Sequence, residues 1–424
     1  MISALEVVTS EITGFKTPIG EKEMSEWQFS RIRDAMRRSV SNSAACAARF
    51  ACVDISSITS YEALESVPFT YPEEITKRPL DFVCVPGRDI SRVTSLNTSG
   101  STGAPKRIFF TEKDLARTAR LFEIGMAPII GPRGRRCVVM MSDTTPGSMG
   151  SLLKEGVERS GVPASVYGFI YDADDAARYL RDGDVLVGVP AQILHLCRKY
   201  PKLRPESILL TADYVPAPLP DAIRELWGCR VYTHFGMTET CFGCAVQCSE
   251  TSAQHIRHDS LLIEIIDPKS GKALPPGKEG EIAVTVFANE AMPLFRYRTG
   301  DISSLETGKC ECGSVLPRLG RVRGRLKNIY STECGSFSIE AIDDVLYKNR
   351  SLWRYSAVLS EEEKSRVLYV KAAGDDSLNA EDILKRLSDI LPRGIKASVD
   401  VSSDKEGKDE VRKRHITLRR GTGS

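Results

Sequence analysis

The chain has 424 residues, which is longer than one hydrophobic core usually serves, so we expect two or three domains. A hydrophobic fraction of 42%, a charged fraction of 27% and a net charge of +2 are ordinary for a globular protein and give no reason to expect nucleic acid or an acidic membrane as a partner. The N-terminus lacks a basic region followed by an apolar run, and no stretch reaches the roughly 18 apolar residues that span a bilayer. We therefore expect a cytoplasmic protein.

The first half of the chain predicts helices and buried strands in alternation. Residues 24–50 have helical character, because Trp27, Phe29 and Ile32 begin an apolar stripe and an Ala-rich turn follows. Short apolar runs then alternate with amphipathic stretches, which predicts a mostly parallel sheet with helices on both faces. The predicted strands are residues 135–141, 184–190, 207–213 and 229–235, and the predicted helices are residues 113–126 and 190–200.

The second half changes character. The runs LLIEIID at 261–267 and EIAVTVF at 281–287 are separated by a turn-rich segment, which predicts an antiparallel sub-domain. After the basic segment 320–328, strands at 355–360, 365–373 and 396–401 and a helix at 380–391 predict a small α+β domain. The predicted fold class is therefore α/β: a large N-terminal domain of parallel-sheet sub-domains with helices and a small antiparallel β sub-domain, followed by a small α+β C-terminal lid domain.

Residues 97–106, NTSGSTGAPK, form a run rich in Ser, Thr and Gly that ends in Lys106. Hydroxyls and glycine amides can surround phosphate oxygens, and a lysine adds a point charge. The run is not a Walker A loop, and alone it is typical of an ordinary loop. Three further motifs follow it in order, namely HFGMTET at 234–240, RYRTGD at 296–301 and GRLKN at 324–328. Four such pieces together favour a nucleotide site.

In these motifs the sequence resembles the adenylate-forming superfamily, which contains acyl-CoA synthetases, luciferases and peptide-synthetase adenylation domains. It is most similar to the phenylacetate-CoA ligase (CapK-like) branch, through its short length, AMPLFRYRTGD at 291–301 and KCECGSVLPRLGRVRGR at 309–325. The resemblance covers roughly residues 24–424. It implies an N-terminal AMP-binding domain at residues 1–323 and a mobile C-terminal domain at residues 324–424, with the hinge near Lys327.

The resemblance also assigns roles at the nucleotide site. It implies that Thr238 touches the α-phosphate of ATP, Glu239 ligates Mg²⁺ and Asp301 accepts the ribose hydroxyls. It also implies that Arg325 is a second ribose or phosphate contact. Ala212-Asp213 stands where the family usually has a Gly-Gly-Glu strand end beside the adenine. The other implied nucleotide contacts are Ser99, Gly100, Ser101, Thr102, Gly103 and Lys106 for the phosphates, and His234, Phe235, Gly236 and Met237 in the aromatic motif.

The C-terminal domain departs from the family pattern. Lys327-Asn328 stands where the branch usually has Asp-Asp, although luciferase-like relatives also have a hinge lysine. The catalytic lysine of the family has two candidates in EGKDEVRKRHITLRR at 406–420. Lys408 follows a glycine, whereas Lys413 has the better spacing from the preceding strand and from the final arginines, and we favour Lys413.

Three of the twelve cysteines and one of the five histidines form a set with the character of metal ligands. Cys248, His255 and the pair Cys310-x-Cys312 offer the thiolates and imidazole that hold structural Zn²⁺. The C-x-C spacing is tighter than usual, and free thiols on loops are the alternative. Cys244 and His258 are the alternative ligands.

The predicted activity is an AMP-forming acid–thiol ligase. ATP and Mg²⁺ would activate a carboxylic acid, aryl or arylalkyl by analogy with the branch, to an acyl-adenylate, and CoA would then take the acyl group. One alternative is a carrier-protein or cofactor acceptor, as in coenzyme F390 synthetase relatives, and another is a degenerate nucleotide-binding relative without turnover. A homodimer is left open. The candidate acid pocket is Met141, Ser142, Pro146 and Met149.

Overall fold

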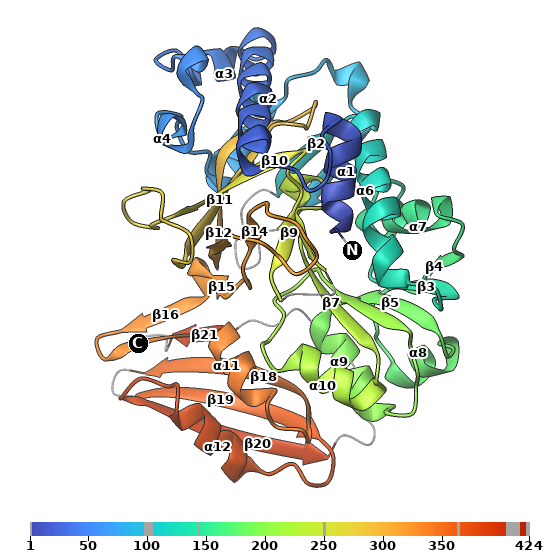
Figure 1. Ribbon diagram of the computed structural model, residues 1–424. Coiled ribbons are helices and arrows are strands. Elements are labelled where there is room, and N and C mark those ends of the chain that lie inside the picture. Colours follow the sequence, from blue (N-terminus) through green and yellow to red (C-terminus); the bar gives the residue numbers. More distant parts are fainter. Residues whose placement is uncertain are drawn as a thin grey trace. The chain divides into compact units, whose positions relative to one another are not determined.

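The computed structural model describes residues 2–96, 105–142, 145–248, 252–362, 365–403 and 416–420 (Figure 1). The chain forms two compact units. Unit 1 consists of Met1–Gly131, Asp143–Ala164 and Tyr232–Val322, and unit 2 consists of Pro132–Ser142, Ser165–Val231 and Arg323–Ser424. Each unit is thus built from three separate stretches of chain. The predicted boundary between residues 323 and 324 separates domains that would move during the reaction. The division into compact units does not test such movement, so this boundary stays a prediction.

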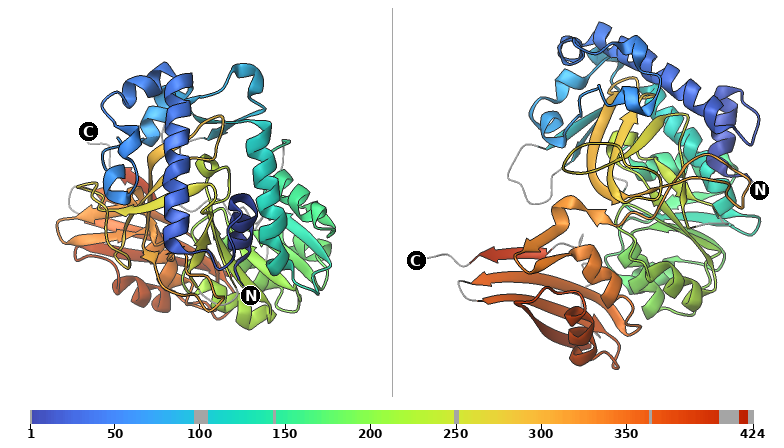
Figure 2. Two further views of the ribbon diagram at one scale, coloured as in Figure 1. Left: turned by 45° about the horizontal axis from the view of Figure 1, so that its top comes forward. Right: turned by 60° about the vertical axis from the view of Figure 1, so that its left-hand side comes forward.

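Helices surround the sheets of unit 1, and Figure 2 shows α2 as the long blue helix in both views. The longest, α2 and α6, bury apolar stripes of the kind that the sequence predicts. The helices are α1 (Ala4–Thr13), α2 (Glu21–Asn42), α3 (Ala44–Arg49), α4 (Tyr61–Leu64), α5 (Pro72–Lys77), α6 (Glu112–Ile130) and α7 (Met149–Arg159).

The helical character predicted for residues 24–50 is confirmed, and it is divided between two helices, α2 and α3. Ser43 is extended between α2 and α3, and its hydroxyl accepts a hydrogen bond from Cys46 N at the start of α3. The same hydroxyl donates to the carbonyl of Asp81 at 2.7 Å. This contact with a distant residue selects the break, because serine competes well with the helix for hydrogen bonds.

The strands of unit 1 pair mainly in antiparallel fashion, which confirms the predicted antiparallel sub-domain. β10, β11 and β12 form one sheet, with Leu261 opposite Val286, and β7 to β9 continue with β14 and β13 in another. The strands are β1 (Arg92–Leu96), β2 (Lys106–Phe110), β8 (Ala245–Gln247), β9 (Gln254–Ile256), β10 (Leu261–Ile266), β11 (Gly280–Val286), β12 (Leu294–Ser303), β13 (Leu305–Glu306) and β14 (Arg318–Leu319), while β4 (Ala164–Val166) and β7 (Arg230–Phe235) cross the unit boundary.

Unit 2 contains the predicted parallel strands. β3 (Arg136–Met140), β5 (Asp184–Gly188) and β6 (Ser207–Leu210) pair in parallel, and every residue of β5 is buried. Such burial requires the continuous apolar run that the sequence has there. The helices of this stretch are α8 (Ala173–Tyr179), α9 (Pro190–Lys199) and α10 (Leu219–Trp227).

The C-terminal stretch of unit 2 is the predicted small α+β fold. Its sheet has the order β20-β19-β18-β21, and α11 and α12 lie together against it (Figure 1). Buried side chains of this stretch join those of residues 138–231 in one hydrophobic core. The elements are β15 (Gly324–Arg325), β16 (Ile329–Thr332), β17 (Gly335–Ser338), α11 (Ile339–Leu346), β18 (Leu352–Glu362), β19 (Ser365–Gly374), α12 (Ala380–Ser388), β20 (Ile395–Ser403) and β21 (Ile416–Arg420).

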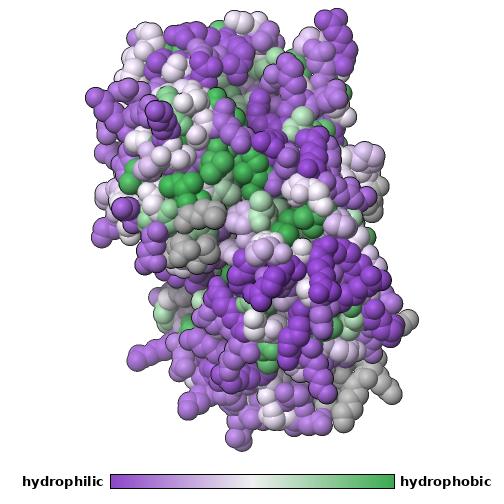
Figure 3. Space-filling model, turned by 45° about the vertical axis from the view of Figure 1, so that its right-hand side comes forward, coloured by the Kyte–Doolittle hydropathy of each residue, from purple (hydrophilic) through white to green (hydrophobic). Residues whose placement is uncertain are grey.

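Among the described residues, large apolar side chains at the surface are scattered. Hydrophilic residues cover most of the face shown in Figure 3. Exposed large hydrophobic residues are scattered along the sequence and include Ile12, Leu80, Val93, Tyr171 and Leu226. Within the described ranges, no helix has both the length and the apolar character needed to cross a membrane.

Candidate active site and metal cluster

A buried group of three polar side chains lies in unit 1. Lys106, at the start of β2, forms an ion pair with Glu239 Oε1, and these side chains are only 12% and 3% exposed. The hydroxyl of Tyr297, on β12, donates to the same oxygen at 2.8 Å and lies 3.0 Å from Lys106 Nζ. The structure therefore brings two of the predicted residues together and adds a third. A carboxylate that receives two donors on one oxygen is strongly oriented.

The turn that carries Glu239 follows directly from β7. Thr238–Thr240 form one 3-10 turn, and Thr240 Oγ1 accepts from Met237 N at 3.3 Å. Gly236 is required just before this turn, because an ideal Cβ there would lie 2.0 Å from the carbonyl oxygen of Phe242. The turn therefore folds back on Gly236 and points the Glu239 carboxylate into the interior.

Asp301 lies on the same strand as Tyr297 and is 3% exposed. Gly300 precedes it with φ of 73° and donates its N–H to Glu281 Oε1 at 3.1 Å. Thr299 Oγ1 accepts from Asp301 N at 3.0 Å. The TGD motif is therefore a tightly bonded local structure that holds one buried carboxylate.

His234 and Phe235 are partly buried at the end of β7, where they pair with Val246 and Ala245 of β8. Burial lowers the pKa of His234 from 6.5 to about 4, so this imidazole is neutral at physiological pH. A neutral ring suits a contact with an apolar or aromatic group better than one with phosphate.

The predicted adenine and hinge residues lie in unit 2. Ala212 has φ of 68°, the left-handed conformation that glycine adopts freely. Asp213 Oδ1 accepts from Tyr214 N at 2.8 Å. Arg325 and Lys327 are exposed around the 3-10 turn Leu326–Asn328.

The four residues predicted for the acid pocket belong to both units. Met141 and Ser142 follow β3 in unit 2, where Met141 is buried and Ser142 exposed, whereas Pro146 and Met149 are in unit 1. Arg92 of β1 donates to the carbonyl of Pro146, which fixes the start of α7. Several predicted residues fall outside the described ranges, namely Ser99, Gly100, Ser101, Thr102, Gly103, Lys408 and Lys413.

The four predicted zinc ligands are brought together in unit 1. The ligand atoms of Cys248, His255, Cys310 and Cys312 all lie within 4.8 Å of one another. The sulfurs of Cys248 and Cys310 are 3.9 Å apart, and Cys312 Sγ lies 3.6 Å from His255 Nε2. Burial, with help from neighbouring cations, lowers the pKa of His255 to about 4 and keeps the ring neutral, as a metal ligand must be.

Strand pairing explains how these distant residues meet. His255, on β9, lies opposite Val246 of β8 and Arg318 of β14. Strand pairing therefore brings the end of β8, which precedes Cys248, and the segment before β14, which contains Cys310 and Cys312, toward His255. The two replacement candidates are placed elsewhere. His258 lies 2.9 Å from the carbonyl of Pro317 through Nε2, and among the described residues neither it nor Cys244 joins the cluster.

Sequence reasoning missed three contributors to the site. Tyr297 is inside a quoted motif, but only Asp301 received a role there. Asn289 donates to the Glu239 carbonyl at 3.4 Å, and Asp114 receives backbone N–H groups close by. The spacing Thr111-x-x-Asp114 is a recognisable helix cap, yet it carries no sign of the distant contacts.

The chain is similar in sequence to known proteins. Residues 85–286 match the model of the family described as AMP-binding enzyme. The chain is 27% identical to the phenylacetate-coenzyme A ligase of Thermus thermophilus over 382 residues, which is 82% of this chain and 84% of that protein. It is also 27% identical to the Pseudomonas putida enzyme of the same name, over 71% of this chain and 70% of that one.

Solved structures confirm the fold. A 2-hydroxyisobutyryl-CoA ligase in its postadenylation state matches with a TM-score of 0.77 and 19% identity, over 92% of this chain and 88% of that one. Residues 85–286 are thus similar to AMP-binding enzymes, and the chain has the fold of this CoA ligase. The predicted resemblance to the adenylate-forming superfamily, and to its phenylacetate-CoA ligase branch, is confirmed.

Proposed function

We propose that this chain is an AMP-forming acid–thiol ligase that activates a carboxylic acid with ATP and transfers the acyl group to CoA. The observation that carries the proposal is the buried Glu239 carboxylate, held by Lys106 and Tyr297 inside a chain that matches AMP-binding enzymes. The relatives named as ligases of phenylacetate and CoA support this activity. By the same comparison we propose an aryl or arylalkyl acid as the substrate class.

Glu239 fits the role of a Mg²⁺ ligand. Its carboxylate is 3% exposed and already faces a positive charge, that of Lys106, and a hard cation that bridges phosphates needs few protein carboxylates. Bound Mg²⁺ would act as a Lewis acid that neutralises charge on the phosphate oxygens of ATP. Glu239 would hold the ion, and Lys106, released from Glu239, would be free to contact a phosphate.

The chemistry of the two half-reactions follows from the substrates. An oxygen of the acid attacks the α-phosphorus of ATP, the bond to the bridging oxygen breaks, and pyrophosphate leaves. The thiol of CoA, after loss of its proton, then attacks the acyl carbon, and AMP leaves. Lys106 and Thr238 would orient the phosphates, Asp301 would hold the ribose, and Lys413 would serve the first half-reaction. Rotation about Lys327 would bring the C-terminal domain into its second position.

Exchange of radioactive pyrophosphate into ATP, measured over a panel of aryl and arylalkyl acids, tests the first half-reaction, and detection of the CoA thioester tests the second. Glu239→Gln and Lys106→Met should abolish exchange. Glu26→Gln and Lys22→Met are matched controls, because these side chains are 70% and 91% exposed, and they should keep it. Binding of ATP without exchange for any acid would contradict the proposal, and adenylation without a CoA thioester would favour another acceptor.

We also propose a structural Zn²⁺ at Cys248, His255, Cys310 and Cys312. Zn–S and Zn–N bonds of about 2.3 and 2.0 Å in a tetrahedron place two sulfurs about 3.8 Å apart, and a sulfur and a nitrogen about 3.5 Å apart. The observed separations are 3.9 Å and 3.6 Å. Such an ion would join the β8–β9 hairpin to the loop before β14.

Elemental analysis should find about one zinc per chain, and chelation should lower the thermal midpoint. Cys310→Ser should lose the metal, while Cys334→Ser, at an exposed thiol, should keep it. Full stability after chelation, together with no zinc in the purified protein, would contradict this site. The cytoplasmic location and the homodimer stay predictions.

A further inference from the structure

The turn that carries Glu239 ends in an unusual backbone conformation. Cys241 and Phe242 have φ angles of 52° and 70°. Residues with side chains rarely adopt this left-handed region, and they stay in it only where surrounding contacts hold them. Phe242 N donates to the carbonyl of Met237 at 2.9 Å, which closes the turn around Glu239. The contacts that hold the backbone of Cys241 therefore influence the direction of the Glu239 carboxylate.

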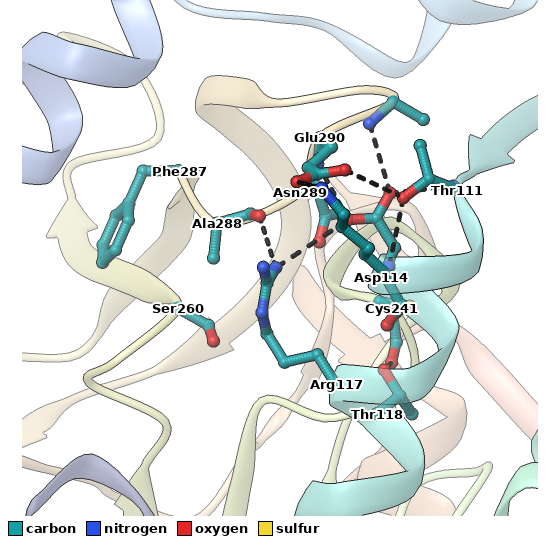
Figure 4. A network of polar contacts seen from close by, with 12 residues as sticks. Thr111, Asp114, Arg117, Thr118, Cys241, Ser260, Phe287, Ala288, Asn289 and Glu290 are labelled. Carbon is teal, nitrogen blue, oxygen red and sulfur yellow. Dashed lines mark hydrogen bonds and ion pairs between the residues drawn. The ribbon is translucent and has the colours of Figure 1, made fainter. Parts of the chain in front are cut away.

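Helix α6 provides these contacts (Figure 4). Thr118 Oγ1 donates to the carbonyl of Cys241 at 2.9 Å, and the Cys241 thiol donates to the carbonyl of Asp114 at 3.5 Å. Gly243, which follows this turn, also packs closely against α6. A Cβ on Gly243 would lie 2.2 Å from Leu121 Cδ2 of α6. The turn thus rests directly on one face of this helix.

The Asp114 carboxylate fixes α6 to a second segment that reaches Glu239. This side chain is fully buried and accepts from the backbone N–H groups of Thr111, Glu290 and Ala291, at 3.0, 2.8 and 3.2 Å. Asn289 directly precedes Glu290 and Ala291 in the chain. Its side-chain amide donates to the carbonyl of Glu239 at 3.4 Å. Figure 4 shows Asp114 between the start of α6 and the 287–290 segment. Glu239 is therefore held from two sides through groups that converge on α6.

The chain order links this support to Lys106. β2 begins at Lys106, and α6 begins at Glu112, directly after Thr111. The strand that delivers the lysine to Glu239 thus continues into the helix that supports the turn of Glu239. We infer that Asp114 and Thr118 are positioning residues that act through the backbone to hold the Glu239 carboxylate in place for Mg²⁺ and ATP. The inference rests on the proposed function. It concerns residues that touch neither the carboxylate nor the substrates.

Thr118→Val removes one hydroxyl at nearly constant volume, and Thr118→Ser keeps it. The experiment titrates Mg²⁺ in the pyrophosphate-exchange assay, and in calorimetric binding of α,β-methylene-ATP, with the full-length chain. Thr118→Val should raise the Mg²⁺ concentration for half-maximal effect by about fivefold, the worth of one hydrogen bond. The KM for the acid should not change, and Thr118→Ser should restore wild-type behaviour. Thr76→Val is the matched control, because Thr76 Oγ1 donates to the Pro72 carbonyl at 3.0 Å in another helix.

A second arm uses the backbone itself. Glycine adopts the φ of Cys241 at no cost, so in a Cys241→Gly background Thr118→Val should change the Mg²⁺ requirement by less than about twofold. An equal change in both backgrounds would overturn the inference, as would a loss of stability in Thr118→Val with unchanged Mg²⁺ dependence. If the wild type exchanges no pyrophosphate, the proposed function fails, while the calorimetric titration still decides the positioning role.

Discussion

Replacing Tyr297 by Phe tests how the central carboxylate is held. The substitution deletes one hydroxyl that lies 2.8 Å from Glu239 Oε1 and 3.0 Å from Lys106 Nζ, in a side chain only 1% exposed. The ring remains, so no large cavity forms. What is lost is the hydrogen bond that the hydroxyl donates to the buried carboxylate, worth about 2 kcal/mol, together with the one that it accepts from Lys106.

Two measurements should respond to this loss. In domains of about 150–250 residues, the thermal midpoint shifts by about 2–4 °C for each kcal/mol of lost stability. The thermal midpoint of unit 1 should therefore fall by about 4–8 °C. The kcat/KM of pyrophosphate exchange should fall by about tenfold or more, since a carboxylate that is free to turn no longer presents its oxygens in one place. Tyr369→Phe is the matched control, because Tyr369 is 47% exposed, and it should leave both quantities unchanged.

A double-mutant cycle separates the two partners of Glu239. Lys106→Met also leaves the carboxylate without one of its donors, so the effects of Tyr297→Phe and Lys106→Met on the free energy of unfolding should not add. Additive effects would show that the hydroxyl and the ammonium act independently. A Tyr297→Phe protein that keeps both its thermal midpoint and its exchange rate within about twofold of the wild type would refute the reasoning.

Three further predictions concern other residues of the two units. Gly236→Ala should destabilise the protein by about 1–3 kcal/mol and abolish exchange, because its Cβ would lie 2.0 Å from the Phe242 carbonyl oxygen; unchanged melting would contradict this. Asn328→Asp should lower the melting temperature at pH 7 more than at pH 4, since Asn328 Nδ2 donates at 2.5 Å to the buried Glu340 and a carboxylate there would repel it. Because burial lowers the pKa of His234 from 6.5 to about 4, its contribution to stability is full above pH 6.5 and is lost as pH falls toward 4, by up to about 3 kcal/mol; His234→Gln should flatten that part of a stability–pH curve.

The sequence was sufficient for the elements whose pattern depends on burial alone. The run DVLVGVP predicted a strand buried on both faces, and β5 is such a strand. The break at Ser43 could not be predicted in the same way. Its position depends on the carbonyl of Asp81, 38 residues further along the chain, and no local pattern indicates that contact.

The register of β12 explains why Tyr297 was missed. This strand pairs with β11 through two irregularities, between Glu281 and Ala283 and between Val284 and Val286. Arg296 has φ of 46° at the same place. An irregular ladder re-aims side chains, so the alternation of inward and outward residues cannot be read from the sequence. Motif spacing located Asp301, but the direction of Tyr297 required the structure.

The metal cluster shows a different limit. Residue types and rough proximity in sequence selected Cys248, His255, Cys310 and Cys312, yet Cys244 and His258 satisfied the same criteria. The choice depends on which residues the strand pairing of β8, β9 and β14 directs to one point. Donor chemistry can therefore be predicted from a single sequence, whereas the membership of a cluster depends on topology.

The Cys241–Phe242 turn lies beyond sequence reasoning for a physical reason. In a sequence, glycine or asparagine indicates a position with positive φ. Here a cysteine and a phenylalanine adopt positive φ, and each residue held in this conformation costs on the order of 1–3 kcal/mol. A sequence selected for stability alone would place glycine at such positions. That strain persists directly after Glu239, held by the Thr118 hydroxyl and the Asp114 carbonyl, and this is why the inference of a positioning role begins at these two residues.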